Sequence, residues 1–174
     1  MNRNVTLRNR YTSKLLLYEA ECKETIGEKK QKMYDLSSKF NTFYSSNVVL
    51  PQAVQDELYN KKNLNIQRLK DGLKEYNEEN GTSYSVVETC VQGSVAMSTV
   101  VQNEDSDYDI DVAVVFSKTA LGDKGAQATR NMVANALRKK TKQFNAEPEV
   151  KTSCVRIKYA DGYHIDFAVY RRYY

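Results

Sequence analysis

Aspartates at alternate positions open one apolar segment of this chain, and a lone aspartate lies inside a second one. The segment DSDYDIDVAVVF carries Asp109 and Asp111 directly before the apolar run 112–116. Alternate side chains of a β-strand project from the same face, so a strand here places both carboxylates together and turns Ile110 toward the core. The nearly continuous apolar run is typical of a strand buried on both faces. Asp166 lies within YHIDFAVY, which is also a predicted strand.

This arrangement of carboxylates favours a metal site. Two carboxylates about 7 Å apart on one strand face repel each other unless a positive charge lies between them. Mg²⁺ prefers oxygen ligands, and Mn²⁺ is the alternative ion. If the two strands are neighbours, Asp166 completes a triad for two metal ions, which suits phosphoryl or nucleotidyl transfer. The alternative is that residues 105–109 form a solvated turn without a ligand.

A Gly-Ser pair after the β-rich segment TCVQ is a candidate phosphate-binding turn. Gly93 allows the backbone to approach an anion closely. A helix that begins at Ser94 would point free N–H groups and the positive end of its dipole at a phosphate. Thr99 adds a hydroxyl about one turn further on. Taken alone, the pair is weak evidence, because a capping turn without a ligand is its usual explanation.

Periodicity predicts the remaining elements. Apolar residues at helical spacing predict a helix over 35–44, a long helix from about Pro51 to Glu79 that ends at Asn80-Gly81, and a helix over 123–143. The Asp161-Gly162 pair predicts a hairpin turn between two final strands. The order helix, strand, strand, helix, strand, strand indicates a mixed α/β or α+β fold.

Composition excludes several classes of protein. The 174 residues correspond to about one domain, and no apolar run approaches the 18 residues that a membrane-spanning helix needs. The apolar stretch near the N-terminus is too short for a signal peptide, so a cytoplasmic location is the default. A net charge of +4 is too weak to indicate a nucleic-acid partner.

The cysteines and the single histidine narrow the chemistry further. Cys22, Cys90 and Cys154 show no CxxC spacing, which argues against a disulfide framework or a zinc ribbon. Cys90 and Cys154 lie in strand-like segments and are expected to be buried small hydrophobes. His164 alone builds no multi-histidine metal site, and no GxSxG motif accompanies it as a Ser-His-Asp hydrolase would require.

The Gly-Ser pair, the DxD strand and the later aspartate together resemble the DNA polymerase β-like nucleotidyltransferases. Within that superfamily the chain is similar to the cGAS/DncV-like nucleotidyltransferases (CD-NTases). The resemblance rests on KFNTFYSSNVVLPQAVQDEL, QGSVAMSTVVQNEDSDYDIDVAVVF and KTSCVRIKYADGYHIDFAVYRR, and it covers roughly residues 35–174. It implies an α+β fold: a polymerase β-like core in which helices flank a mixed sheet and a long helix lies at the N-terminus.

The resemblance also assigns roles by position. The residues that it implies for nucleotide and phosphate binding are Gln92, Gly93, Ser94 and Thr99. The residues that it implies for catalysis and for binding two Mg²⁺ ions are Asp109, Asp111 and Asp166. Asp107 is a rival for the first acid, because DYDI also fits a DxD motif. Ser98 stands where many relatives have glycine, which should affect loop conformation more than metal binding.

The implied activity is synthesis of a cyclic di- or trinucleotide from ATP, GTP or other NTPs. In this family such products serve antiphage signalling by activating an effector protein. Members also have a mostly helical C-terminal half, so the expected domain, residues 33–174, is truncated: the chain is either a fragment, which could hold metals and triphosphate yet lack base selection and turnover, or a reduced form of the protein. Residues 1–32 are a charged extension, and Met33 is an alternative start.

Two other functions remain open at this point. The first is a nucleotide-binding or toxin/antitoxin-type module on the same fold, without cyclase activity, since fold alone does not settle function. The second is transfer of a nucleotide to a protein or RNA hydroxyl. The modest charge and the lack of a basic stripe speak against RNA.

Alternation in SCVRIKY places Arg156 and Lys158 on one strand face. If this strand pairs with the strand that carries Asp166, either cation lies near the triphosphate or balances the acids. The alternative is a solvated strand face. The functional interpretation predicts that Arg156→Ala weakens nucleotide binding with little loss of stability.

Overall fold

The computed structural model describes residues 35–103, 105–141 and 147–173, and the chain divides into two units, residues 1–42 and 43–174. The expected extension 1–32, the alternative start at Met33 and Cys22 lie outside the described residues. Helix α2 (Ser37–Phe43) begins after Asp35, whose carboxylate accepts a hydrogen bond from the backbone N–H of Ser37 at 2.9 Å. A π-helical turn, η1 (Tyr44–Val48), follows. The helix predicted over 35–44 is therefore present.

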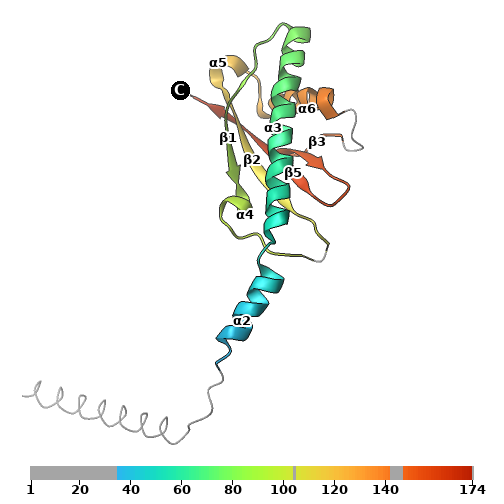
Figure 1. Ribbon diagram of the computed structural model, residues 1–174. Helices are drawn as coiled ribbons and strands as arrows, with labels where there is room; N and C mark the ends of the chain where they lie inside the picture. Colours follow the sequence, from blue (N-terminus) through green and yellow to red (C-terminus); the bar gives the residue numbers. More distant parts are fainter. Residues whose placement is uncertain (1–34, 104, 142–146, 174) are drawn as a thin grey trace, which may run out of the picture. The chain divides into compact units, whose positions relative to one another are not determined.

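A five-stranded sheet is the centre of the second unit, and its strand order is β1-β2-β5-β4-β3 (Figure 1). The strands are β1 (Val86–Gln92), β2 (Asp109–Ser117), β3 (Glu149–Val150), β4 (Cys154–Lys158) and β5 (His164–Arg172). Strand β2 pairs with β1 in antiparallel and with β5 in parallel orientation, and β4 and β5 form the predicted hairpin. The mixed sheet and the α+β architecture are therefore confirmed.

Two helices cover one face of this sheet. Helices α3 (Gln52–Asn80) and α6 (Ala126–Thr141) pack against each other and contribute to a single apolar core with the sheet (Figure 1). Along β2, the side chains of Ile110, Val112 and Val114 are completely buried in that core. Asp109, Asp111 and Val115 alternate with them and stay partly exposed. Ala113, on the face away from α3 and α6, is also buried, so the expectation that 112–116 is buried on both faces holds except at Val115, which is partly exposed.

The long helix α3 ends as its sequence predicts. Gly81 adopts a left-handed conformation, with φ of 61°, and its N–H donates to the carbonyl of Asn77. Further back, Gly72 allows α3 to touch α6, because a Cβ at this position would lie 1.9 Å from the carbonyl oxygen of Ala136. Two short helices complete the unit: α4 (Gly93–Ala96) and α5 (Lys118–Leu121).

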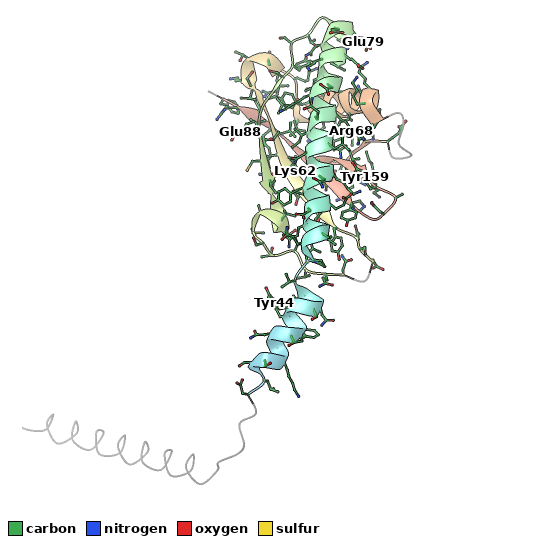
Figure 2. All side chains as sticks on the ribbon, viewed as in Figure 1. Tyr44, Lys62, Arg68, Glu79, Glu88 and Tyr159 are labelled. Carbon is green, nitrogen blue, oxygen red and sulfur yellow. The ribbon has the colours of Figure 1, made fainter. Side chains whose placement is uncertain are left out.

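Polar contacts fasten the β4–β5 hairpin to α3. The Lys61 ammonium donates to Asp161 at 2.8 Å and lies over the rings of Tyr159 and Tyr163. The fully buried Asn65 donates to the Tyr159 hydroxyl at 2.6 Å. Figure 2 shows Tyr159 beside α3, where Arg68 also donates to its hydroxyl. These contacts fix the hairpin whose second strand carries Asp166.

No helix among the described residues combines the length and the apolar character that crossing a membrane requires.

Candidate active site

Three carboxylates meet where two parallel strands begin. Asp109 and Asp111 are the first and third residues of β2, and Asp166 lies opposite Asp111 in β5. One oxygen of each carboxylate lies within 4.8 Å of the other two. Asp166 is 5% exposed, whereas Asp109 and Asp111 are partly open to solvent. The structure thus brings together the three acids that the sequence predicts.

The charges in this cluster are poorly balanced. Burial raises the pKa of Asp111, and the negative charges of Asp109 and Asp166 raise it further. Such repulsion is relieved by a cation between the carboxylates, and an all-oxygen donor set suits Mg²⁺ or Mn²⁺. The residues present therefore fit a divalent metal site.

Arg156 is the cation that faces the cluster. It pairs in register with Asp166, and its guanidinium donates from Nε to Oδ1 at 2.8 Å and from Nη2 to Oδ2 at 2.6 Å. The hydrogen bonds to Asp166 raise the pKa of Arg156, so it stays charged. Lys158 lies opposite His164 and is exposed. Strand alternation placed Arg156 and Lys158 on one face, and of these two cations Arg156 is the one that pairs with an acid. Its single positive charge faces three carboxylates, so the site remains acidic.

The Gly-Ser turn lies directly beside the acids. Gln92 pairs in register with Asp111, and α4 begins at the next residue. Gly93 has φ of 64°, and a Cβ there would lie 2.1 Å from Oδ2 of Asp111. Only glycine fits this position, because a side chain would be strained and would collide with the carboxylate. The predicted helix is present and starts with Gly93, one residue before Ser94.

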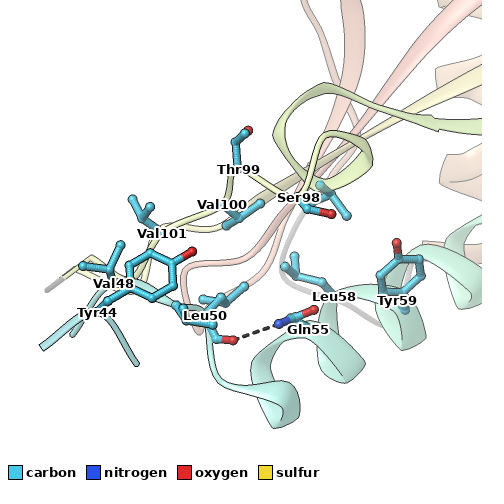
Figure 3. A pocket seen from close by; sticks show the side chains of 12 residues that line it. Tyr44, Val48, Leu50, Gln55, Leu58, Tyr59, Ser98, Thr99, Val100 and Val101 are labelled. Atoms are coloured by element: carbon cyan, nitrogen blue, oxygen red, sulfur yellow. Dashed lines mark hydrogen bonds between the residues drawn. The ribbon is translucent and has the colours of Figure 1, made fainter. Parts of the chain in front are cut away.

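Thr99 borders a pocket that the three carboxylates do not line. Its hydroxyl donates to the carbonyl of Ser94 at 3.4 Å, and it borders a pocket of about 510 Å³ between the start of α3 and the segment after α4 (Figure 3). The described residues that line this pocket are mainly apolar and include none of the three aspartates. Ser98, also in the lining, has φ of 56°, a conformation that favours glycine. This agrees with the expectation that Ser98 affects the loop.

Asp107 is outside the cluster. It precedes β2, and its exposed carboxylate lies 3.1 Å from Nδ1 of His164. The geometry therefore favours Asp109 over Asp107 as the first acid. The expectation that both cysteines are buried holds for Cys154 and is wrong for Cys90, which is exposed and pairs with Ala113 on the face away from α3 and α6.

Tyr170 is a site residue that sequence reasoning missed. Its hydroxyl donates to Oε1 of Gln92 at 3.2 Å, across β2. Strand alternation from Asp166 places Tyr170 on the same face, which is the signal that was available. The contact itself depends on the strand order, which the sequence does not state.

Comparisons with known proteins support this geometry. Residues 87–170 match the family model described as "Cyclic GMP-AMP synthase DncV-like, nucleotidyltransferase domain". The match covers all three acids and the Gly-Ser turn, and it confirms the resemblance to the cGAS/DncV-like nucleotidyltransferases.

Solved structures of such enzymes share the fold. CdnC of Escherichia coli MS115-1, in a complex with HORMA-deltaN, matches with a TM-score of 0.55 and 22% identity over 78% of this chain and 41% of its own. DncV of Vibrio cholerae with the linear intermediate 5′ pppA(3′,5′)pG gives 0.58 and 14% over 74% and 48%. CdnG of Bradyrhizobium diazoefficiens with GTP gives 0.54 and 21% over 74% and 35%. The chain therefore spans less than half the length of these structures.

Proposed function

We propose that this chain, whose residues 87–170 match a DncV-like nucleotidyltransferase domain, is the catalytic part of a Mg²⁺-dependent enzyme that joins NTPs into a cyclic di- or trinucleotide. ATP and GTP are the proposed substrates, and CdnG and DncV in the matched structures carry GTP and a linear A–G intermediate. The proposed role is antiphage signalling in the cytoplasm, through an effector that responds to the product. The observation that carries the proposal is the triad of carboxylates beside the Gly93 turn.

In this proposal each residue of the site has a defined task. Asp109, Asp111 and Asp166 hold two Mg²⁺ ions, which when bound offset the negative charge of the acids and of the triphosphate. The turn at Gly93 and Ser94 brings backbone N–H groups close to phosphate oxygens. Arg156 fixes the carboxylate plane of Asp166 by its two hydrogen bonds.

The chemical step requires a proton acceptor for the attacking ribose hydroxyl. Each carboxylate oxygen has two lone pairs, so Asp166 keeps acceptor capacity after it accepts the two hydrogen bonds from Arg156. Asp166 accepts the hydroxyl proton, the hydroxyl oxygen bonds to the α-phosphorus of the second nucleotide, and pyrophosphate leaves. A second round of the same reaction closes the ring.

The test is incubation of the full chain with radiolabelled NTPs and Mg²⁺, followed by phosphatase treatment. We expect a phosphatase-resistant product, and we expect the double variant Asp109→Ala/Asp111→Ala to form none while it still unfolds cooperatively. Asp107→Ala is the matched control, because it removes a nearby acid outside the triad. Absence of product in every NTP mixture would contradict the proposal, and nucleotide-dependent thermal stabilisation without product would indicate a binding module instead.

A further inference from the structure

The side chain of Tyr170 connects two strands that are not neighbours. Tyr170 belongs to β5 and Gln92 to β1, and β2 lies between them in the sheet. The hydroxyl of Tyr170 nevertheless donates to Oε1 of Gln92 at 3.2 Å. The side chain therefore crosses β2 on the face that α3 and α6 leave open.

Small residues on that face make the crossing possible. Ala113 of β2 and Ala168 of β5 are paired in register, between the row of Tyr170 and the row of Asp166. Neither has a side chain that would block a ring lying across the strands. Ala113 is 4% exposed although it alternates with the core residues of β2, so atoms on the open face cover it.

The hydrogen bond from Tyr170 reaches Gln92, the residue that precedes the proposed phosphate-binding turn at Gly93 and Ser94. Gln92 immediately precedes Gly93 and pairs in register with Asp111. A carboxamide has its acceptor oxygen on one side and its two N–H donors on the other. When Tyr170 holds the oxygen, the donors of Gln92 are turned in a fixed direction at the edge of the acidic cluster.

We propose that Tyr170 is a positioning residue for nucleotide binding, which acts by orienting the Gln92 carboxamide so that its N–H groups donate to an oxygen of the bound nucleotide. This inference rests on the proposed function, because it assigns Tyr170 and Gln92 to the same NTP site. Tyr170 itself stays 47% exposed and does not belong to the core, so its hydroxyl is available for this task rather than for folding.

The test is a double-mutant cycle on the full chain, with Mg²⁺-ATP and Mg²⁺-GTP as separate probes in calorimetric titrations. Tyr170→Phe keeps the ring and removes the hydroxyl, and we expect it to weaken nucleotide binding about three- to tenfold. Gln92→Ala should weaken binding at least as much, and the double variant should bind no more weakly than Gln92→Ala alone. Tyr173→Phe is the matched control, since Tyr173 contacts Lys118 instead, and it should leave affinity unchanged.

Two further measurements separate the outcomes. In the nucleotide-free protein, Tyr170→Phe should shift the NMR signals of the Gln92 side-chain amide while the urea midpoint of unfolding stays at its wild-type value. The inference fails and the proposed function stands if the losses of nucleotide affinity caused by Tyr170→Phe and Gln92→Ala multiply in the double variant. The same conclusion follows if Tyr170→Phe binds nucleotide as wild type does while Asp109→Ala does not bind it. If the wild-type chain binds neither nucleotide, both fail.

Discussion

The pairing of Arg156 with Asp166 is the most consequential contact at the level of single residues. Asp166 is 5% exposed and its carboxylate plane is held by two hydrogen bonds from one guanidinium. A buried carboxylate without a partner is costly, because it loses its water and gains nothing in return. Arg156 therefore contributes to stability and to the geometry of the site together.

This contact changes what Arg156→Ala is expected to do. From the sequence alone, a charge on a strand face is expected to matter for stability by only about ±0.5 kcal/mol. With the pair formed, we expect the free energy of unfolding to fall by about 1–3 kcal/mol, since Asp166 is left buried and unpaired. Urea denaturation in EDTA measures the loss, and Lys158→Ala, at an exposed position of the same strand, is the matched control. A loss no larger than that of Lys158→Ala would contradict the prediction.

Single residues also show how far a sequence predicts a site. Alternation within a strand placed Asp109 and Asp111 together and put Arg156 on the face of Asp166, because these relations are local. Cys90 was expected to be buried, but it is exposed. A run of apolar residues does not show that α3 and α6 cover the same face of the sheet. The contact between Tyr170 and Gln92 depends on β2 lying between their strands, which no local pattern contains.

At the level of elements, α3 and α6 approach each other closely at Gly72. A methyl group there would lie 1.9 Å from the carbonyl oxygen of Ala136 and 2.7 Å from its carbonyl carbon, both of which belong to a helix backbone that cannot move aside alone. Gly72 is therefore needed for packing, although glycine inside a helix lowers helix propensity.

Gly72→Ala tests this packing. Helix propensity alone predicts a gain of about 1 kcal/mol, whereas the collision predicts a net loss of about 1–3 kcal/mol as the helices are forced apart. We expect the loss, measured as a lower urea midpoint. Gly125→Ala is the control, because a methyl group at Gly125 would meet open space and the backbone there has no positive φ, so stability should change little. A stabilised Gly72→Ala variant would show that the helices separate freely.

The hairpin is held to α3 by a pair that depends on pH. Burial raises the pKa of Asp161, but the hydrogen bond and charge of Lys61 outweigh it, so the pKa of Asp161 is lowered in the folded state. A lowered carboxyl pKa contributes stability that is present above the unfolded value, about 3.9, and is lost as pH falls through the folded value.

Asp161→Asn should therefore destabilise the protein at pH 7 and have no effect at about pH 2. The side chain of Asp161 is half exposed, so we expect a loss of about 0.5–1 kcal/mol at pH 7. Urea denaturation of both proteins between about pH 2 and pH 7 measures the difference. A difference that persists at the lowest pH would mean that Asp161 acts through packing instead of charge.

Elements differ in how well the sequence predicts them. The 29-residue helix α3, its end at Gly81 and the hairpin at Asp161-Gly162 follow from strong periodicity and turn residues. The two-residue strand β3 and the four-residue helix α5 escaped prediction, because they are too short to show a hydrophobic pattern. The sheet order follows from packing between distant segments and is visible only in the structure.

At the level of the molecule, the sheet of the second unit has α3 and α6 on one face (Figure 1) and the three acids on the other. The helix face supplies the apolar core, while the open face carries three acids, Arg156 and the Tyr170 contact. The apolar core and the proposed chemistry therefore lie on opposite faces of the same strands. The cost is that unneutralised carboxylates remain on the open face, where burial and neighbouring charges raise the pKa of Asp111.

This division predicts that metal and nucleotide stabilise the whole fold together. At a concentration about one hundred times its dissociation constant, a ligand adds about 2.7 kcal/mol, which for a chain of this size corresponds to roughly 5–10 °C in Tm. We expect Mg²⁺ with ATP or GTP to raise Tm by about that much in differential scanning fluorimetry. Nucleotide in EDTA should raise Tm far less, and the variant Asp109→Ala/Asp111→Ala should show no rise.

In EDTA that variant should be at least as stable as wild type, because it loses two mutually repelling charges and no core contact. An equal rise in Tm for the variant would place the nucleotide elsewhere on the molecule, and a large loss of its stability in EDTA would show that the acids support the fold.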